Sequence, residues 1–186
     1  VKIVKNGKEE IIKGSKIIIA TGSKPSTLKN IVIDEKKIVS STGALELDKV
    51  PKKLVVIGAG VIGLEMGTVW RRLGSEVEII EFLPRILNEM DEEISEKFMK
   101  ILVSQGVNFR LGCSVEKASV KGNFVDLQIK NQSNLKQESI ESDIVLVAVG
   151  RVPNSDNLGL DEIGLKVDKR GFIETNENFE TSQKNI

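Results

Sequence analysis

Residues 54–65 read Leu-Val-Val-Ile-Gly-Ala-Gly-Val-Ile-Gly-Leu-Glu. The four apolar residues at the start are typical of a strand that is buried on both faces of a sheet. They run directly into a turn that contains Gly58, Gly60 and Gly63, and an amphipathic segment follows. Strand, glycine turn and helix in this order predict the first unit of a parallel α/β sheet.

The segment behind the glycine turn carries its apolar residues at helical spacing. Intervals of four, three and four residues place them on one side of a helix, and we expect that side to be buried. Gly74 follows the last of them and suits the left-handed position that commonly ends a helix. The predicted buried stripe consists of Ile62, Met66, Val69 and Leu73.

The alternation of strand and helix continues to residue 111. Residues 77–81 form a second apolar strand, Asp91 is a good N-cap for a second helix, and residues 107–111 predict a third strand. This β-α-β-α-β order is that of a parallel sheet covered by helices. The predicted buried face of the second helix consists of Ile94, Phe98, Ile101 and Leu102.

A period of two replaces the helical spacing after residue 111. Short alternating segments at 115–120, 124–129 and 137–140 are joined by polar turns, which predicts a three-stranded antiparallel meander in place of a crossover helix. Residues 143–150 then return as a buried strand. The predicted fold class is therefore α/β, a Rossmann-like parallel sheet with helices and a three-stranded antiparallel meander crossover.

The start of the chain is less regular. Residues 1–4 and 10–12 flank the turn residues Asn6 and Gly7, which predicts a β-hairpin. The apolar run 16–20 predicts a further strand buried on both faces. Few other core candidates occur before residue 50, so this part is expected to be the tail of a domain.

Composition excludes several classes of function. Lysine plus arginine balances aspartate plus glutamate at 27 each, so no net positive charge favours nucleic acid as a partner. No apolar run approaches the roughly 20 residues of a membrane helix, and the N-terminus does not resemble a signal peptide. Histidine is absent and Cys113 is the single cysteine, so we expect no metal site and no dithiol pair within this chain, and part of a catalytic apparatus to be missing from it.

The glycine spacing has a mechanical reason that points to a dinucleotide. Gly58 permits the tight turn, Gly60 lets the backbone approach a pyrophosphate, and Gly63 lets helix and strand pack closely. Free N–H groups at the helix start then receive the phosphate charge. A strand precedes the turn, a helix follows it, and the acid Glu81 lies 23 positions after Gly58 at the end of the next strand (81 − 58).

Glu81 favours NAD over NADP, because a carboxylate accepts hydrogen bonds from the adenosine ribose and repels a 2′-phosphate. It does not separate NAD from FAD, which binds similar turns. Arg85 is available for a phosphate or is a solvated loop charge. Glu65 either stabilises the helix as an acid of its first turn or contacts the nicotinamide; its position alone leaves both roles open.

Several segments together resemble the dihydrolipoamide dehydrogenases, which are pyridine nucleotide–disulfide oxidoreductases. The resemblance covers essentially the whole chain and is strongest at residues 39–45, 54–65, 69–74, 81–82, 149–154 and 157–160. It implies that Glu65 approaches the nicotinamide. The implied NAD contacts are Gly58, Ala59, Gly60, Val61, Ile62, Gly63, Leu64, Glu65, Glu81, Val115 and Gly150, and the implied FAD contacts are Thr21, Gly22 and Ser23.

The resemblance also implies a parent enzyme longer than this chain. Residues 1–50 would be an FAD-domain tail and connector, 51–165 the NAD-binding domain, and 166–186 a return segment towards the FAD domain. The parent would be a homodimeric flavoprotein of the bacterial cytoplasm or mitochondrial matrix that passes electrons from the lipoyl groups of 2-oxoacid dehydrogenase complexes through a disulfide and FAD to NAD⁺. The resemblance places the catalytic residues outside this chain, so it would hold none of them and is expected to be inactive alone. The alternatives are an NADH oxidase, another disulfide reductase, or a non-catalytic dinucleotide-binding redox sensor.

Overall fold

The computed structural model describes all residues from 1 to 186. The chain divides into two compact units. The central unit is Pro25–Gly150, and the terminal unit combines Val1–Lys24 with Arg151–Ile186. The division of the chain into FAD-binding and NAD-binding domains remains a prediction.

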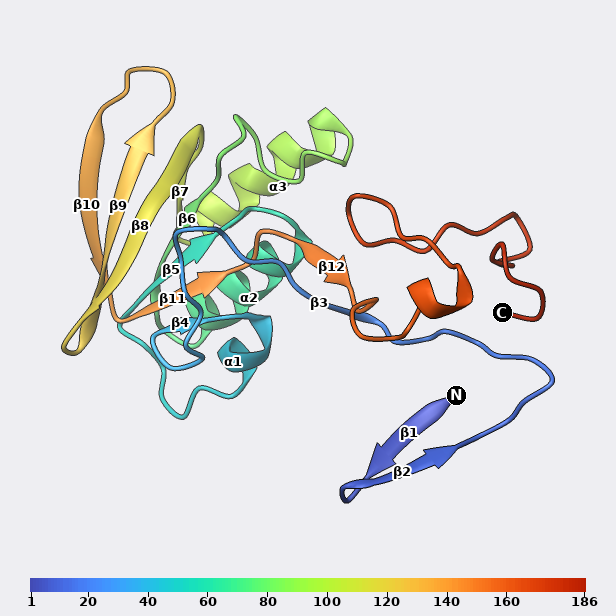
Figure 1. Ribbon diagram of the computed structural model, residues 1–186. Coiled ribbons are helices and arrows are strands. Elements are labelled where there is room, and N and C mark those ends of the chain that lie inside the picture. Colours follow the sequence, from blue (N-terminus) through green and yellow to red (C-terminus); the bar gives the residue numbers. More distant parts are fainter. The chain divides into compact units, whose positions relative to one another are not determined.

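A parallel five-stranded sheet forms the centre of the central unit (Figure 1). Its strand order is β4-β11-β5-β6-β7, and every neighbouring pair is parallel. The α/β fold class predicted from the sequence is confirmed. The strands are β4 (Ile38–Val39), β5 (Lys53–Ile57), β6 (Glu76–Ile80), β7 (Val107–Arg110) and β11 (Ile144–Val147).

Three helices belong to the central unit: α1 (Ser41–Leu45), α2 (Val61–Arg72) and α3 (Glu92–Ser104). The predicted N-cap of α3 is confirmed, since the Asp91 carboxylate accepts a hydrogen bond from the Ile94 N–H at 3.3 Å. None of the helices of this chain has the length and apolar content needed to cross a membrane.

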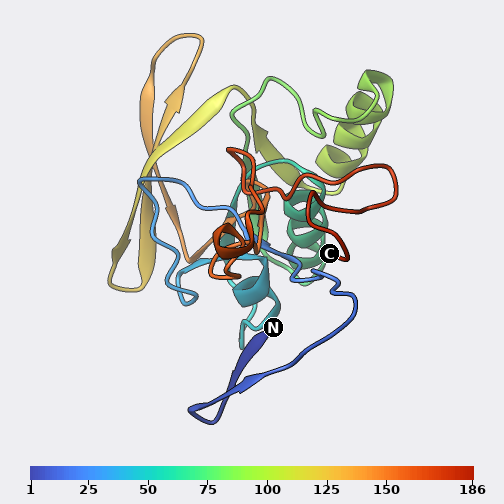
Figure 2. The same ribbon diagram turned by 45° about the vertical axis from the view of Figure 1, so that its right-hand side comes forward.

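The meander predicted after residue 111 is confirmed as a second sheet in the order β10-β9-β8. Its strands are β8 (Cys113–Lys121), β9 (Phe124–Asn131) and β10 (Gln137–Ser142), and both pairings are antiparallel. Figures 1 and 2 both show it on the side of the parallel sheet opposite to α2 and α3. The central unit therefore has three layers.

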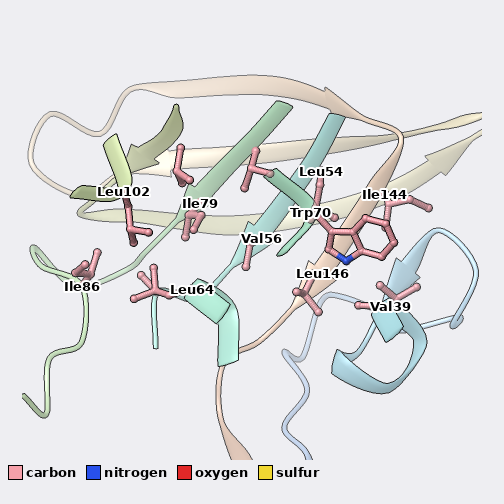
Figure 3. Close-up of a cluster of buried hydrophobic side chains, with 14 residues drawn as sticks. Val39, Leu54, Val56, Leu64, Trp70, Ile79, Ile86, Leu102, Ile144 and Leu146 are labelled. Atoms are coloured by element: carbon pink, nitrogen blue, oxygen red, sulfur yellow. The ribbon is translucent and has the colours of Figure 1, made fainter. Parts of the chain in front are cut away.

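Alternating side chains of the parallel strands build a separate core on each face. On the helix face, Leu54 and Val56 of β5 pack with Trp70 of α2 (Figure 3). On the meander face, Val55 and Ile57 of the same strand pack with apolar side chains of β8, β9 and β10. The four apolar side chains of β5 are all buried, because each face of the sheet is covered.

The predicted buried stripe of α2 is half right, since Ile62 and Met66 are partly buried and Met66 packs against the helix-face core. Val69 and Leu73 are 49% and 56% exposed. The buried residues of the helix are Gly63, Leu64, Gly67 and Trp70. Glycine explains why the observed buried face of α2 differs from the predicted one. A Cβ at Gly67 would lie 3.2 Å from Ile79 Cδ1, so the small residues let the helix backbone approach the sheet. A pattern that scores only large apolar residues misses such a face.

The predicted buried face of α3 is half right. Leu102 is buried and Phe98 is partly buried against the helix-face core, whereas Ile94 and Ile101 are 59% and 51% exposed. Ser95 is buried in their place, and its hydroxyl donates to the carbonyl oxygens of Leu87 and Asp91. A polar residue occupies a buried position here because its hydrogen bonds are satisfied.

The terminal unit contains the predicted hairpin. Strands β1 (Lys2–Lys5) and β2 (Lys8–Ile11) pair across a turn in which Asn6 and Gly7 both have positive φ. A second short pair joins β3 (Ser23–Pro25) to β12 (Arg151–Pro153), and a 3₁₀ turn covers Asp161–Ile163.

The strand predicted at residues 16–20 does not form. These residues pair with no strand, and the Ile18 side chain is 89% exposed. An apolar run becomes a buried strand only where a neighbouring edge satisfies its backbone, and this run has no such neighbour. Few core residues before residue 50 were also expected, yet four apolar side chains of the central unit are buried there: Ile31, Ile38, Val39 and Ala44.

Candidate functional site

The glycine turn joins β5 to α2 and shows three different reasons for glycine. Gly58 has φ 104°, and a Cβ there would lie 2.6 Å from the carbonyl oxygen of Ala148, the residue that directly follows the neighbouring strand β11. A Cβ at Gly63 would overlap the carbonyl oxygen of Gly58, so this glycine lets the helix close onto the turn. A Cβ at Gly60 would meet no atom within 4 Å, which leaves open space beside the turn.

The start of α2 offers free backbone donors beside Gly60. Gly60 is the N-cap and supplies no side-chain cap, and the Leu64 N–H makes an intrahelical bond to the Gly60 carbonyl at 3.0 Å. The N–H groups of Val61, Ile62 and Gly63 precede that bond and are the unsatisfied donors of a helix start. This arrangement suits an anionic group. Leu64 is a core residue, and its side chain is 2% exposed (Figure 3).

Glu81 lies beside the glycine turn, where the sequence spacing places it. It follows β6 directly, and its Oε2 accepts a hydrogen bond from the Ala59 N–H at 2.6 Å. Its Oε1 accepts from the Leu83 N–H at 2.8 Å. The acid and the turn therefore meet through a direct contact, although they are 22 residues apart in the chain.

Two other predicted residues lie near this site, Val115 on β8 and Gly150 after the end of β11. The Cys113 N–H donates to the Glu81 carbonyl at 2.9 Å, so β8 starts beside Glu81 and carries Val115 two residues further on. Gly150 follows β11, whose end packs against Gly58, and it has φ 116°. The carboxyl ends of β5, β6 and β11 thus bring these positions to one edge of the sheet.

Glu65 is exposed and lies in the second turn of α2, since no acid stands in the first turn. The alternative role of Glu65 as a first-turn acid that stabilises the helix dipole is therefore wrong. Arg85 is held by its own loop, because its Nη2 donates to the carbonyl oxygens of Asn88 at 2.7 Å and Met90 at 3.3 Å.

The predicted FAD contacts belong to the terminal unit. The Thr21 hydroxyl donates to the Asn154 carbonyl oxygen at 2.7 Å, and the Asn154 N–H donates to the Gly22 carbonyl at 2.9 Å. The Arg151 guanidinium donates to the hydroxyl of Ser23 at 2.7 Å. These bonds join the two ends of this unit around a turn in which Gly22 has φ 71°.

Sequence reasoning missed an ion cluster around the buried Glu78 on the meander side of the sheet. The Glu78 side chain is 9% exposed and pairs with Arg110 and, at 3.1 Å, with Lys53 Nζ. Arg110 also pairs with Glu138 of β10 at 2.7 Å. Burial opposes ionisation of Glu78, but the hydrogen bonds from Arg110 and Lys53 outweigh it and lower the pKa of this carboxyl. The sequence did contain a signal for this cluster, because Glu78 is an acid inside the apolar run 77–81.

Cys113 is buried on the same side. Its thiol donates to the Leu111 carbonyl oxygen at 3.5 Å, and its sulfur accepts from the Asn131 side-chain amide at 3.7 Å. No three acidic, cysteine or histidine side chains come together as a metal site. The surroundings of Cys113 are those of a structural buried thiol.

Comparison with known proteins identifies the class of this chain. The sequence model of the pyridine nucleotide-disulphide oxidoreductases matches residues 1–186, and the chain belongs to this family. Among curated proteins it is 49% identical over 180 residues to a mitochondrial dihydrolipoyl dehydrogenase of Pisum sativum, with 97% of the chain and 36% of the relative covered. It is 44% identical over 186 residues to that of Schizosaccharomyces pombe, with 100% and 36% covered.

Solved structures agree with this classification. An HOCl-induced flavoprotein disulfide reductase of Escherichia coli matches with a TM-score of 0.89 and 28% identity, covering 99% of this chain and 41% of that one. An NAD-dependent persulfide reductase of A. fulgidus matches with a TM-score of 0.83 and 31% identity, covering 99% and 34%. The chain thus spans between a third and a half of the length of these relatives.

Proposed function

We propose that this chain is the NAD(H)-binding part of a flavoprotein dihydrolipoyl dehydrogenase. The observation that carries the proposal is the glycine turn, where packing requires glycine at two positions and leaves open space only at Gly60. A glycine that packing does not require, beside free helix N–H groups, is best explained by a ligand that approaches the backbone there. The curated relatives named dihydrolipoyl dehydrogenase support the choice of enzyme.

The chain's own residues would bind and orient the cofactor. The N–H groups at the start of α2 would receive the pyrophosphate, and Glu81 would accept hydrogen bonds from the adenosine ribose. Val115 would lie against the adenine. Glu65 and Gly150 would approach the nicotinamide end. Held by these residues, NAD⁺ would serve the parent enzyme as the acceptor of the electron pair that dihydrolipoamide gives up by way of a disulfide and FAD.

Selectivity for NAD over NADP would rest on Glu81. Its carboxylate would repel a 2′-phosphate. Arg85 offers no ready compensation, because its guanidinium already donates to two carbonyl oxygens of its own loop. We therefore expect NADH to bind more tightly than NADPH.

The proposal extends to the partners and the location of the parent. Its substrate would be the lipoyl group of a 2-oxoacid dehydrogenase complex, and it would act as a homodimer that binds FAD through Thr21, Gly22 and Ser23. Relatives named mitochondrial and a relative from Pseudomonas putida are consistent with a mitochondrial matrix or bacterial cytoplasmic location.

Calorimetric titration of the 186-residue chain with NADH and NADPH tests the proposal, with Gly60→Ala as the matched variant. We expect NADH to bind the unaltered chain and to bind Gly60→Ala much more weakly, because the new methyl group would occupy the space beside the turn. Thermal unfolding of Gly60→Ala should be unchanged, since its Cβ meets no protein atom. Equal affinity of the unaltered chain for the two cofactors would refute the role of Glu81, and equal NADH affinity of the two proteins would refute the site.

The chain alone should bind NADH without oxidising dihydrolipoamide. It contains one cysteine and no histidine, so it holds neither a dithiol pair nor a histidine acid/base. Assay of the purified chain with dihydrolipoamide and NAD⁺ checks this expectation; turnover would contradict it.

A further inference from the structure

The peptide groups on either side of Ala59 are hydrogen-bonded to the loop that follows β6. The Ala59 N–H donates to Glu81 Oε2 at 2.6 Å, and the Ala59 carbonyl accepts from the Leu87 N–H at 3.0 Å. Ala59 itself is 1% exposed. The second oxygen of the same carboxylate accepts from the Leu83 N–H at 2.8 Å. Glu81 and Ala59 together therefore join the glycine turn to residues 82–90.

The 82–90 loop is itself well anchored at its far end. Ile86 is 1% exposed and belongs to the helix-face core (Figure 3). The Leu87 carbonyl accepts from the buried Ser95 hydroxyl at 3.2 Å, and Arg85 donates to the carbonyl of Asn88. A loop held in this way has a fixed position, and the glycine turn is one of the segments that it contacts.

We infer that Glu81 is a positioning residue for the glycine turn and the 82–90 loop, in addition to the ribose ligand that the proposed function makes it. A carboxylate has about four lone-pair positions, and here two are used by N–H donors, which leaves the others for ribose hydroxyls. A bound ribose could therefore add to these contacts without displacing them. The inference concerns the chain without cofactor, and only its second test below rests on the proposed function.

This arrangement changes what removal of the carboxylate does. If Glu81 only bound the ribose, Glu81→Ala would weaken NADH binding and relieve the repulsion of a 2′-phosphate, so NADPH would bind better. If Glu81 also positions the turn, the same variant leaves the Ala59 and Leu83 N–H groups without an acceptor. The turn then loses its geometry for either cofactor, and NADPH gains nothing.

Amide hydrogen exchange of the 186-residue chain without any cofactor is the first test. In Glu81→Ala we expect the amides of Ala59 and Leu83 to exchange about tenfold faster or more, the factor that corresponds to loss of a charge-assisted hydrogen bond. The decisive amide is that of Leu87, which donates to Ala59 and does not touch Glu81. It should also exchange faster. An unchanged Leu87 amide would overturn the inference.

Two further variants control this experiment. Glu89→Ala makes the same substitution at an exposed position of the same loop and should leave all three amides unchanged. Glu81→Gln keeps one acceptor oxygen, so it should preserve protection of one of its two donors and fold even if Glu81→Ala does not. Full protection of both donors in Glu81→Gln would count against the carboxylate as their acceptor.

Calorimetry with NADH and NADPH is the second test. We expect Glu81→Ala to bind NADH about tenfold more weakly or worse, and NADPH no more tightly than the unaltered chain does. Tighter NADPH binding by Glu81→Ala would show that the carboxylate acts on the ribose alone and would overturn the inference. If the unaltered chain binds neither cofactor, the proposed function fails, and the exchange of the Leu87 amide still decides the positioning role.

Discussion

Two apolar runs of this chain are almost alike in composition and have opposite fates. Lys-Leu-Val-Val-Ile at residues 53–57 forms β5, where the four apolar side chains are at most 5% exposed. Lys-Ile-Ile-Ile-Ala at residues 16–20 forms no strand, and Ile18 is 89% exposed. The difference lies in their neighbours, because β5 pairs with β11 on one side and β6 on the other.

The comparison extends to the two units as wholes. The central unit covers both faces of its sheet, whereas the buried apolar side chains of the terminal unit are Leu160 and Leu165. Apolar content is therefore a poor guide to burial unless other elements can cover it. Four single substitutions test this contrast.

Truncation of β5 should have the largest effect. Leu54→Ala removes a fully buried side chain from the helix-face core, and we expect the free energy of unfolding to fall by about 2–5 kcal/mol. Urea unfolding followed by circular dichroism measures it. A loss as small as the one expected for Ile18→Ala, in the exposed run 16–20, would show that burial in this sheet does not govern stability.

Loss of the buried carboxylate should come next. Glu78→Gln weakens the pairs with Arg110 and Lys53, and we expect a loss of about 1.5–3 kcal/mol at neutral pH. Because the pKa of Glu78 is lowered in the folded chain, its stabilisation is complete above the pKa of an unfolded glutamate, about 4.3, and disappears as the pH falls through the lower folded value.

Urea unfolding at a series of pH values between neutral and acid checks the sign of this dependence. The unaltered chain should lose more stability than Glu78→Gln as the solution becomes acid, so the difference between them should shrink. A difference that is constant over the series would contradict the pKa assignment of Glu78.

A methyl group at the glycine turn should cost about 1–3 kcal/mol when packing forbids it. Gly63→Ala places a Cβ against the Gly58 carbonyl oxygen, so α2 must move away from the turn. Gly60→Ala is the control, because its Cβ meets no protein atom. In thermal unfolding, Gly63→Ala should be less stable than Gly60→Ala. Equal stability of the two variants would mean that the turn can shift to accommodate a Cβ at Gly63.

The smallest effect is expected in the exposed run. Ile18→Ala removes a side chain that is 89% exposed, so the free energy of unfolding should change by less than about 0.5 kcal/mol. The same urea experiment as for Leu54→Ala gives the value. A loss comparable to that of Leu54→Ala would show that residues 16–20 are packed in solution.

Much of the central unit could be predicted from local pattern. The strand at β5, the helix that begins after Gly60, the Asp91 cap and the meander were all predicted from the sequence, since spacing and capping are local properties. The orientation of α2 was not. Its buried face contains Gly63 and Gly67, and whether a glycine faces a sheet depends on how closely the sheet approaches.

The candidate site, too, could be predicted from the sequence only in part. The spacing of Gly58 and Glu81 placed turn and acid at one edge, because parallel strands end together. The Leu87 to Ala59 hydrogen bond was not predictable, because no motif relates the 82–90 loop to the turn. Nor was the partnership of Glu78 with Arg110, although an acid within an apolar strand indicated that some cation had to lie nearby.

Residue order alone was sufficient for the α/β class, the glycine turn and the acid that follows the second strand, because each depends on groups close together in the chain or on the period of a single element. Which apolar runs are buried, which side of α2 faces the sheet and what Glu81 touches were decided by tertiary contacts. Burial and hydrogen bonding are properties of pairs of surfaces, and one segment of sequence describes only one surface of each pair.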